Sequence, residues 1–362
     1  MAGIYVHIPF CKTHCTYCAF YSELLRSPQG SEPFIDALCS EIRSSVSEEA
    51  RTLYIGGGTP SVLSLEQLQR ITDAIGQPSF EEFTMEVNPD DIVKNGPPYV
   101  RGLRQLGVNR ISMGIQSFDN SVLHTMGRRH NAAQAIEAYR MLRQAGFSNI
   151  SIDLIFGFRD NLDTELICRQ LREMGLPQHI SCYQLGIEEG SGLDRMMQKG
   201  LYAMPCDEEC ERQYYAICKL LSDLGYSHYE ISNWALPGYE SKHNSAYWNH
   251  TPYIGLGPGA HSLYVSADGK YVRRWNSDNL QEYVQAAESG RWDSVRGSET
   301  LSARQVEEER VFLGLRTARG IDSASLPKAA EALLVPALDD GYMRIAENRW
   351  FISDSIIVDI IK

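Results

Sequence analysis

Short apolar runs alternate with longer amphipathic stretches along the first half of the chain. The runs are rich in β-branched and apolar side chains, are bounded by Gly, Pro or Asn, and occupy residues 4–8, 52–55, 83–87, 110–115, 150–156 and 179–185. Runs of this length are typical of parallel strands that are buried on both faces. The stretches between them are long enough for helices, so the pattern predicts six successive βα units.

Two of the intervening stretches carry recognisable helix ends. Ser64 is followed three residues later by Gln67, which is the pattern of a capping box. The amphipathic stretch 132–145 is followed by Gly146, as expected at a helix carboxyl end. Six βα units in succession wind in a right-handed sense into a parallel sheet, and they are fewer than the eight that close a full barrel.

The second half of the chain has a different pattern of apolar and aromatic residues. A helical pattern over 207–224 ends at Gly225, and a short strand-like run over 228–231 opens an aromatic-rich stretch. The remainder predicts two or three helices and then a short β pair around Arg344 and residues 350–352. We therefore divide the chain into three regions, 1–200, 201–295 and 296–362.

Charge and hydropathy exclude some classes of partner. The 362 residues include 34 basic and 46 acidic side chains, for a net charge of −12, which argues against nucleic acid as the main partner. No apolar run reaches the roughly eighteen residues of a membrane-spanning helix. The first residues have no basic start followed by an apolar core, as a signal peptide has, so we expect no transmembrane segment and a cytoplasmic location.

Three closely spaced cysteines carry the strongest chemical signal. Cys11, Cys15 and Cys18 have the spacing C-x3-C-x2-C. Three thiolates on one loop can hold three irons of a 4Fe–4S cluster and leave the fourth iron open to a small molecule. A structural zinc site would need a fourth ligand from His7 or His14, and neither spacing fits a zinc ribbon. A disulfide arrangement does not suit an odd number of cysteines, so we predict a cluster.

Further candidate residues lie where the predicted strands end. Ligands of parallel α/β folds bind at the carboxyl ends of the strands, so glycines, acids, amides and arginines at these positions are candidates for binding. An acid within an apolar strand must point into the barrel or find a partner, because burying it alone is costly. The candidates from these segments are Gly57, Gly58, Thr59, Glu86, Gln116, Arg128 and Asp153.

The cysteine spacing resembles that of the radical S-adenosylmethionine (radical SAM) superfamily. The resemblance implies an open six-unit (β/α)6 partial TIM-type barrel, followed here by a small C-terminal α+β domain. It also implies that SAM occupies the open iron.

The superfamily motifs extend the resemblance to individual residues. Gly57, Gly58 and Thr59 resemble the GGTP motif that cradles the methionine amine, and Glu86 resembles the glutamate of an E-x-N-P motif that contacts SAM. Arg128 is the match for the arginine that pairs with the methionine carboxylate, whereas we expect Arg129 to be a solvated surface residue. The resemblance also places Tyr5 and Tyr17 near SAM, although a core role suits Tyr5 equally well.

A closer resemblance covers essentially the full length. The segments 5–11, 17–20, 58–60, 231–233 and 255–260 are similar to the group that contains the anaerobic coproporphyrinogen III dehydrogenases and the HemW haem chaperones. The dehydrogenase branch has an additional cysteine where this chain has Phe20, and a longer arm before the cluster than the ten residues before Cys11. Residues 243–248 match the H-N-x-x-Y-W motif of the HemW branch. Beside two aromatic side chains, His243 could ligate haem iron or could be a histidine buried among core aromatics.

The resemblance implies a haem chaperone with a 4Fe–4S cluster, SAM and haem as bound groups. Its implied partners are apo-haemoproteins, including membrane cytochromes reached peripherally, and a low-potential electron donor. The alternative is an oxygen-independent coproporphyrinogen III oxidase, which forms protoporphyrinogen IX by radical oxidative decarboxylation. A radical SAM enzyme that acts on an unrelated substrate is a third possibility.

Overall fold

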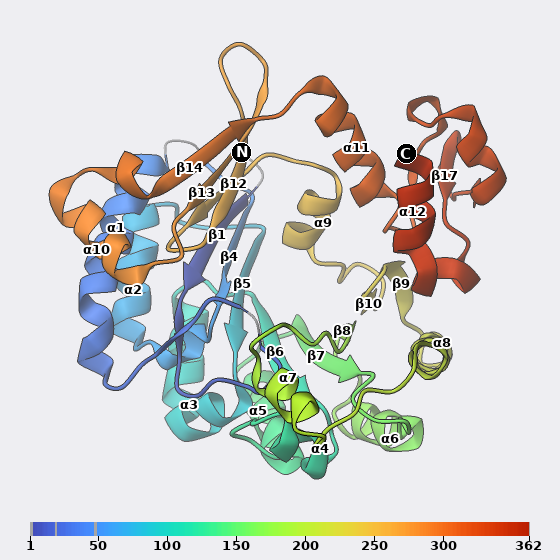
Figure 1. Cartoon of the computed structure of the whole chain (residues 1–362). Coiled ribbons are helices and arrows are strands. Elements are labelled where there is room, and N and C mark those ends of the chain that lie inside the picture. Colours follow the sequence, from blue (N-terminus) through green and yellow to red (C-terminus); the bar gives the residue numbers. More distant parts are fainter. Residues whose placement is uncertain (1–2, 19, 47–48, 362) are drawn as a thin grey trace.

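A long curved sheet organises the molecule (Figure 1). The computed structural model describes residues 3–18, 20–46 and 49–361. Within these residues the main sheet has twelve strands in the order β14-β13-β12-β11-β1-β4-β5-β6-β7-β8-β10-β9.

The centre of the sheet follows the predicted winding. Six strands pair in parallel in chain order: β1 (Gly3–Ile8), β4 (Thr52–Gly57), β5 (Glu82–Val87), β6 (Arg110–Gln116), β7 (Ile150–Phe156) and β8 (His179–Gln184). The helices of this half are α1 (Glu32–Ser45), α2 (Leu65–Ile75), α3 (Pro89–Gln105), α4 (Asn120–Thr125), α5 (Ala132–Gln144), α6 (Thr164–Glu173), α7 (Gly192–Gln198) and α8 (Asp207–Asp223). The six predicted runs coincide with these strands to within two residues at each end.

The predicted helix ends are confirmed. The Ser64 side chain accepts a hydrogen bond from the backbone N–H of Gln67, and the Gln67 side chain accepts one from the backbone N–H of Ser64. Gly146 follows α5 with a φ of +89°, in the left-handed region that glycine adopts at low cost. Local sequence alone therefore sets where these helices begin and end.

The two faces of the central strands differ in chemistry. On β6, Ile111, Met113 and Ile115 are fully buried on the outer face. Arg110 and Ser112, at the alternate positions, line an internal cavity. The length and composition of these runs indicated strands that are apolar on both faces. The structure shows instead that their inner faces carry polar side chains. A barrel whose interior is filled by apolar layers would not carry these polar side chains, so this one is built around a ligand space.

Further strands extend the sheet beyond the predicted units. β11 (Tyr253–Leu256) pairs in parallel with β1, and the antiparallel strands β12 (His261–Val265), β13 (Tyr271–Asn276) and β14 (Arg296–Thr300) continue from it. At the other edge, β10 (Asn233–Ala235) and β9 (Ser227–Glu230) add to β8. The helices α9 (Lys242–Trp248) and α10 (Leu280–Ser289) lie between these strands in the chain. The sheet thus reaches Thr300, and the regional boundaries near residues 200 and 296 remain a prediction.

The last part of the chain forms a small sheet beside helices. α11 (Ala303–Gly314) and α12 (Ser353–Ile361) accompany the strands β15 (Ile321–Asp322), β17 (Tyr342–Arg344) and β16 (Val335–Pro336), in that spatial order. The predicted strand near Arg344 is present. The predicted strand over residues 350–352 is wrong, because they belong to a 3-10 helix in which the buried Trp350 indole donates to the Ile345 carbonyl at 2.9 Å.

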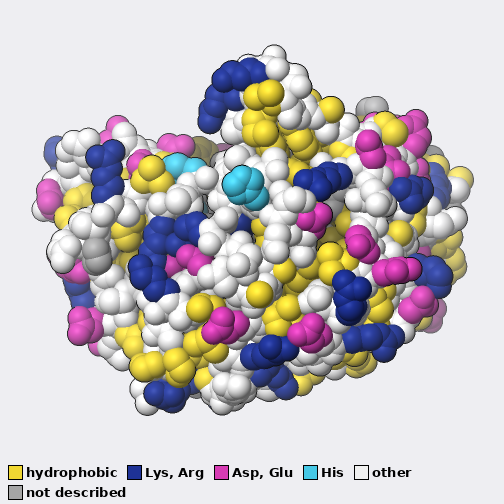
Figure 2. Space-filling model, turned by 90° about the horizontal axis from the view of Figure 1, so that it is seen from below, with side chains coloured by type: hydrophobic (Ala, Val, Ile, Leu, Met, Phe, Trp, Pro, Cys, Tyr) yellow, Lys and Arg dark blue, Asp and Glu magenta, His cyan; other side chains and the backbone are white. Residues whose placement is uncertain are grey.

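Short elements complete the chain. A two-stranded sheet of β2 (Phe10–Cys11) and β3 (Glu23–Leu24) holds the ends of the cysteine loop, and the 3-10 helices are η1 (Pro28–Ser31), η2 (Pro60–Val62), η3 (Trp292–Val295), η4 (Ser323–Ser325), η5 (Lys328–Leu333) and η6 (Glu347–Ile352). No helix among the described residues combines the length and apolarity needed to cross a membrane. Figure 2 views the molecule from the side toward which β1 and its neighbours point, and acidic and basic side chains are interspersed over that face.

Candidate cluster and cofactor site

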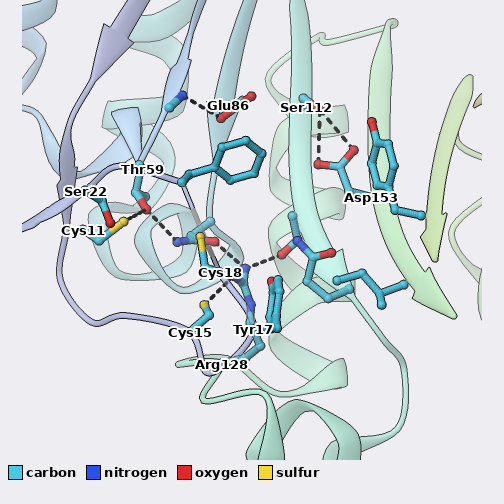
Figure 3. Close-up of a pocket in the computed structure, with 18 of the residues that line it drawn as sticks. Cys11, Cys15, Tyr17, Cys18, Ser22, Thr59, Glu86, Ser112, Arg128 and Asp153 are labelled. Carbon is cyan, nitrogen blue, oxygen red and sulfur yellow. Dashed lines mark hydrogen bonds between the residues drawn. The ribbon is translucent and has the colours of Figure 1, made fainter. Parts of the chain in front are cut away.

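A cavity of about 700 Å³ lies inside the curved sheet and reaches the cysteine loop. Figure 3 shows the cysteines on one side of it and Glu86, Ser112 and Asp153 on the strands. Its lining includes most of the predicted site residues, namely Cys11, Cys15, Tyr17, Cys18, Gly57, Gly58, Thr59, Glu86, Gln116, Arg128 and Asp153. Predicted residues from β4, β5, β6 and β7 and from the cysteine loop thus converge on one space.

The cysteine loop is held by backbone hydrogen bonds to two other segments. The Thr16 N–H donates to the Met126 carbonyl at 3.0 Å, and the Leu193 N–H donates to the Thr16 carbonyl at 2.7 Å. Burial raises the pKa of the Cys11 and Cys18 thiols, so their thiolates require a nearby positive charge such as bound iron. The loop is therefore fixed in place while its thiols remain available as ligands.

The spacing of the thiols suits a cluster better than a single ion. Among the described residues, no three His, Cys, Asp or Glu side chains converge closely enough to hold one metal ion. A tetrahedral zinc needs its sulfurs about 2.3 Å from one centre, whereas a 4Fe–4S cluster takes each thiolate on a different iron. Three thiols that line one cavity are the ligand set that a cluster with one open iron takes.

A chain of side chains links two of the cysteines. The Cys11 Sγ lies 3.3 Å from the Thr59 hydroxyl, and the Asn88 amide donates to that hydroxyl at 3.3 Å. Arg128 donates to the Asn88 carbonyl oxygen at 2.5 Å through Nη2 and to the Cys15 sulfur at 3.3 Å through Nη1. Its Nε is buried and has no partner among the described residues. A buried donor of this kind suits a ligand carboxylate.

Glu86 occupies the end of β5 and faces the same space. Its carboxylate accepts hydrogen bonds from the Tyr54 hydroxyl at 2.8 Å and the Gly57 N–H at 3.1 Å. Burial, together with the nearby charge of Asp153, raises the pKa of Glu86 to about 7. A carboxyl group that ionises so near neutrality is suited to a cationic ligand, which would stabilise its charged form.

The glycines beside Glu86 are required by space. Gly57 has a φ of +110°, and a Cβ there would lie 2.7 Å from the His7 ring. A Cβ on Gly58 would lie 2.7 Å from the Phe10 carbonyl oxygen and 3.1 Å from the Cys11 sulfur. Only glycine lets this turn pass so close to the cysteine loop.

Asp153 faces the cavity from β7. Its two carboxylate oxygens accept from the Ser112 hydroxyl at 3.3 and 3.4 Å. Burial raises the pKa of Asp153 to about 6, against the opposing effects of a hydrogen bond from Ser181 and the charge of Arg110. Two acids with raised pKa values thus face one cavity. A positively charged ligand would stabilise their ionised forms, and SAM, which the resemblance implies, carries a positive sulfonium.

Arg129 is not the solvated residue that we expected. It donates to Asp90 at 2.6 Å and to Asp91 at 3.1 Å, and 19% of its side chain is exposed. The fully buried Asp91 also accepts from the Lys12 ammonium at 2.5 Å and from the Ser61 hydroxyl at 2.9 Å. Asp91 therefore ties the cysteine loop to the segment that carries Arg128. The sequence signal for this role of Asp91 is its place in the acid pair that follows Asn88-Pro89.

Comparison with known proteins agrees with this geometry. The profile described as the Radical SAM superfamily matches residues 5–178. The protein named Heme chaperone HemW of Lactococcus lactis subsp. lactis is 38% identical over 324 residues, covering 88% of this chain and 82% of the relative. Its counterpart in Escherichia coli is 30% identical over 367 residues, covering 97% and 94%. The chain belongs to the HemW family of radical SAM proteins.

The solved structures agree with the predicted fold class. The structure titled coproporphyrinogen III oxidase (HemN) from Escherichia coli superimposes with a TM-score of 0.80, covering 100% of this chain and 90% of that chain at 20% identity. This likeness confirms the α/β radical SAM fold. Membership of the superfamily implies a 4Fe–4S cluster and SAM as cofactors, and the thiols, the unpartnered Arg128 Nε and the two acids fit both groups.

Two predicted residues lie outside the cavity lining. The Tyr5 hydroxyl is 2.9 Å from His7 Nδ1 on the same strand. His243 is 2% exposed, with Nδ1 2.7 Å from the Thr52 hydroxyl and Nε2 2.8 Å from the Tyr247 hydroxyl. Both ring nitrogens are thus engaged, and burial with the charge of Arg110 lowers the pKa of His243 to about 3. In this structure His243 is a core residue rather than one that faces a cofactor.

Sequence reasoning missed the polar inner face of the strands. The cavity is also lined by Tyr54, Asn88, Arg110, Ser112, Ser181, Tyr183 and Asn244. The available signal was the period of two: Arg110 and Ser112 on β6, and His179, Ser181 and Tyr183 on β8, alternate with apolar residues. Asn244, next to His243, is the part of the H-N-x-x-Y-W segment that reaches the cavity.

Proposed function

We propose that this protein is a haem chaperone of the HemW type, which binds haem and delivers it to apo-haemoproteins from the cytoplasm. The observation that carries the proposal is the relationship to HemW proteins over nearly the whole chain, at 38% identity to the Lactococcus lactis relative. The presence of Phe20, where the dehydrogenase branch has a further cysteine, supports the chaperone over the oxidase.

The proposal assigns the resident groups to named residues. Cys11, Cys15 and Cys18 would hold the cluster, with its fourth iron open to the amine and carboxylate of SAM. Arg128 would receive the SAM carboxylate through its unpartnered Nε. A bound and reduced cluster would supply the electron for cleavage of the sulfur–carbon bond of SAM.

The acids would hold the remainder of SAM. Glu86 would accept from an N–H of the SAM amine, and Tyr54 keeps its carboxylate oriented through the 2.8 Å hydrogen bond. The positive ligand favours the ionised form of Glu86, so binding would release a proton near neutral pH. Asp153 would accept from the ribose hydroxyls, oriented by Ser112.

The partners form a finer part of the proposal. We propose that the acceptors are apo-haemoproteins, including membrane cytochromes approached peripherally, and that a low-potential electron donor reduces the cluster. Ligation of haem iron by His243 would require Tyr247 to release Nε2. The H-N-x-x-Y-W segment contains none of the proposed cluster ligands, so haem uptake is expected to survive loss of the cluster.

The deciding experiment compares two reactions on one anaerobically reconstituted preparation. In the first, haem is titrated and then transferred to an apo-cytochrome, and we expect about one haem per chain with recovery of the holo-cytochrome. In the second, coproporphyrinogen III is supplied with SAM and a reductant, and we expect no carbon dioxide above a protein-free control. The Cys11→Ala variant should still take up haem. Turnover of coproporphyrinogen III would replace the proposal by the oxidase alternative.

A further inference from the structure

Arg110 is a buried cation whose charge is not matched by an ion pair. It begins β6, is 2% exposed and lines the cavity. Within the described residues, its one hydrogen bond runs from Nη1 to the Thr84 hydroxyl at 3.5 Å, its Nε is buried without a partner, and no carboxylate lies within ion-pair distance. Burying a guanidinium without an anion beside it is costly, because the charge loses most of its hydration.

The groups around Arg110 form no direct ion pair with it among the described residues. Its charge contributes to lowering the pKa of the buried imidazoles of His179 and His243, which are therefore neutral. His179 is also fully engaged, with Nδ1 2.7 Å from the Ser151 hydroxyl and Nε2 2.8 Å from the Tyr229 hydroxyl. Asp153 is near enough for its pKa to be lowered by Arg110, but its carboxylate is oriented by Ser112. An anion from outside the chain would complete the site.

Arg110 and Arg128 lie near opposite ends of β6. Arg128 contacts the Cys15 sulfur and the Gly114 carbonyl near the end of β6. Arg110 stands at the beginning of the same strand, about 13 Å from Gly114 along it at the usual rise per residue. SAM has a single carboxylate, which the proposed function assigns to Arg128. A carboxylate at Arg110 must therefore come from a second ligand.

We infer that Arg110 binds a propionate of a haem-type tetrapyrrole, as a carboxylate subsite at the inner end of the cavity. This inference rests on the proposed function, because it takes haem as the second ligand. A guanidinium suits a carboxylate because its planar N–H donors can form two parallel hydrogen bonds. Ser112, Ser181, Tyr183 and Asn244 line the same cavity and offer further polar groups. The ligand edge would then lie next to Asp153, where the proposed function places the ribose of SAM.

The test separates the carboxylate from the rest of the ligand. Haem and haem dimethyl ester, which has no free carboxylate, are titrated into wild type, Arg110→Gln, Arg110→Lys and the control Arg140→Gln. Arg140 is an exposed arginine that pairs with Glu173 at 2.7 Å. SAM is titrated into the same cluster-loaded proteins by calorimetry, and thermal unfolding checks that each variant is folded.

We expect Arg110→Gln to weaken haem binding roughly tenfold to a hundredfold, with the ester and SAM affinities unchanged. Arg110→Lys should recover part of the loss, and Arg140→Gln should match wild type. Equal affinity of Arg110→Gln and wild type for haem would overturn the inference and leave the chaperone proposal intact. The same holds if Arg110→Gln loses affinity for SAM but not for haem. Should Arg110→Gln fail to fold, equal binding of haem and its ester to wild type would overturn it. A wild type that binds no haem would reject both.

Discussion

The Arg128 guanidinium lies 3.3 Å from the sulfur of Cys15, and its other terminal nitrogen donates to Asn88 and to the Gly114 carbonyl. One side chain therefore spans the cysteine loop and the carboxyl ends of β5 and β6. This contact makes the proposed cluster and SAM sites one unit, because a shift of the loop would move the arginine. Variants that affect SAM alone must keep the positive charge of Arg128 beside Cys15.

The three loop cysteines are expected to be individually essential for the cluster. Reconstituted wild type should bind about four irons and four sulfides per chain, and replacement of Cys11, Cys15 or Cys18 by Ala should abolish this content. Cys206→Ala is the matched control, because Cys206 is an exposed thiol outside the cavity. Iron and sulfide analysis with the visible spectrum measures the result. A normal cluster in Cys15→Ala would contradict the assignment.

Arg128→Lys should separate charge from geometry. Lysine keeps the positive charge near Cys15 but lacks the planar fork that suits a carboxylate, so the cluster should remain while SAM binds about tenfold more weakly. Calorimetry on cluster-loaded protein measures the affinity, and Arg140→Gln serves as the exposed-arginine control. If Arg128→Lys binds SAM as tightly as wild type, Arg128 does not bind the SAM carboxylate.

Glu86→Gln should stabilise the ligand-free protein at high pH. The folded-state pKa of Glu86 is raised to about 7, so folding favours the protonated form. The stability that this provides is present below the unfolded-state pKa and is lost as pH rises through about 7. Glutamine keeps the neutral form, so the variant should gain roughly 1–3 kcal/mol over wild type at pH 8 and little at pH 5.

Two measurements check this prediction. Thermal unfolding at both pH values gives the stability difference, and SAM titration at pH 8 should show weaker binding to Glu86→Gln, because the carboxylate that would accept from the SAM amine is gone. A variant that is equally stabilised at pH 5 and pH 8 would show that Glu86 ionisation is not the cause.

Asp91→Asn should loosen the cysteine loop. The buried carboxylate is shared by Lys12, Ser61 and Arg129, so its loss removes the ion pair of Lys12 and one of the two ion pairs of Arg129. We expect the free energy of unfolding to fall by about 2–4 kcal/mol and cluster loss in chelator to become faster. Asp223→Asn, which breaks the exposed pair with Lys219, should cost less than about 1 kcal/mol. Unchanged stability and cluster retention in Asp91→Asn would show that Asp91 does not hold the cysteine loop in place.

His243→Ala should behave as a core substitution. It removes a buried ring that contacts Thr52 and Tyr247, so the melting temperature should fall by several degrees. The Soret band of bound haem should keep its position, since both ring nitrogens are engaged within the protein. A shifted Soret band with an unchanged melting temperature would instead identify His243 as an iron ligand.

Much of the central architecture was readable from the sequence. The runs that became β1 and β4 to β8, the capping box of Ser64 with Gln67, and the Cys11, Cys15 and Cys18 spacing are all local patterns. Such patterns are set by neighbours within a few residues, through strand burial, helix-end hydrogen bonds and metal-ligand spacing. The residues named from strand ends converge on one cavity because parallel strands present their carboxyl ends at the same edge.

Other features depended on contacts that are distant in the chain. β11 joins β1 across about 250 residues, and no local pattern states that partner. Arg129 is mostly buried and pairs with Asp91, and both ring nitrogens of His243 are engaged by Thr52 and Tyr247. Asp91 and Thr52 are distant in the chain from the residues that they contact, so these partners come together only after folding. Sequence by itself determined the six central strands, the cluster motif and the candidate residues of the strand ends. Only the tertiary structure decided which polar groups are satisfied by the protein and which, like the Nε atoms of Arg110 and Arg128, are left for a ligand, because that depends on what packing brings within hydrogen-bond distance.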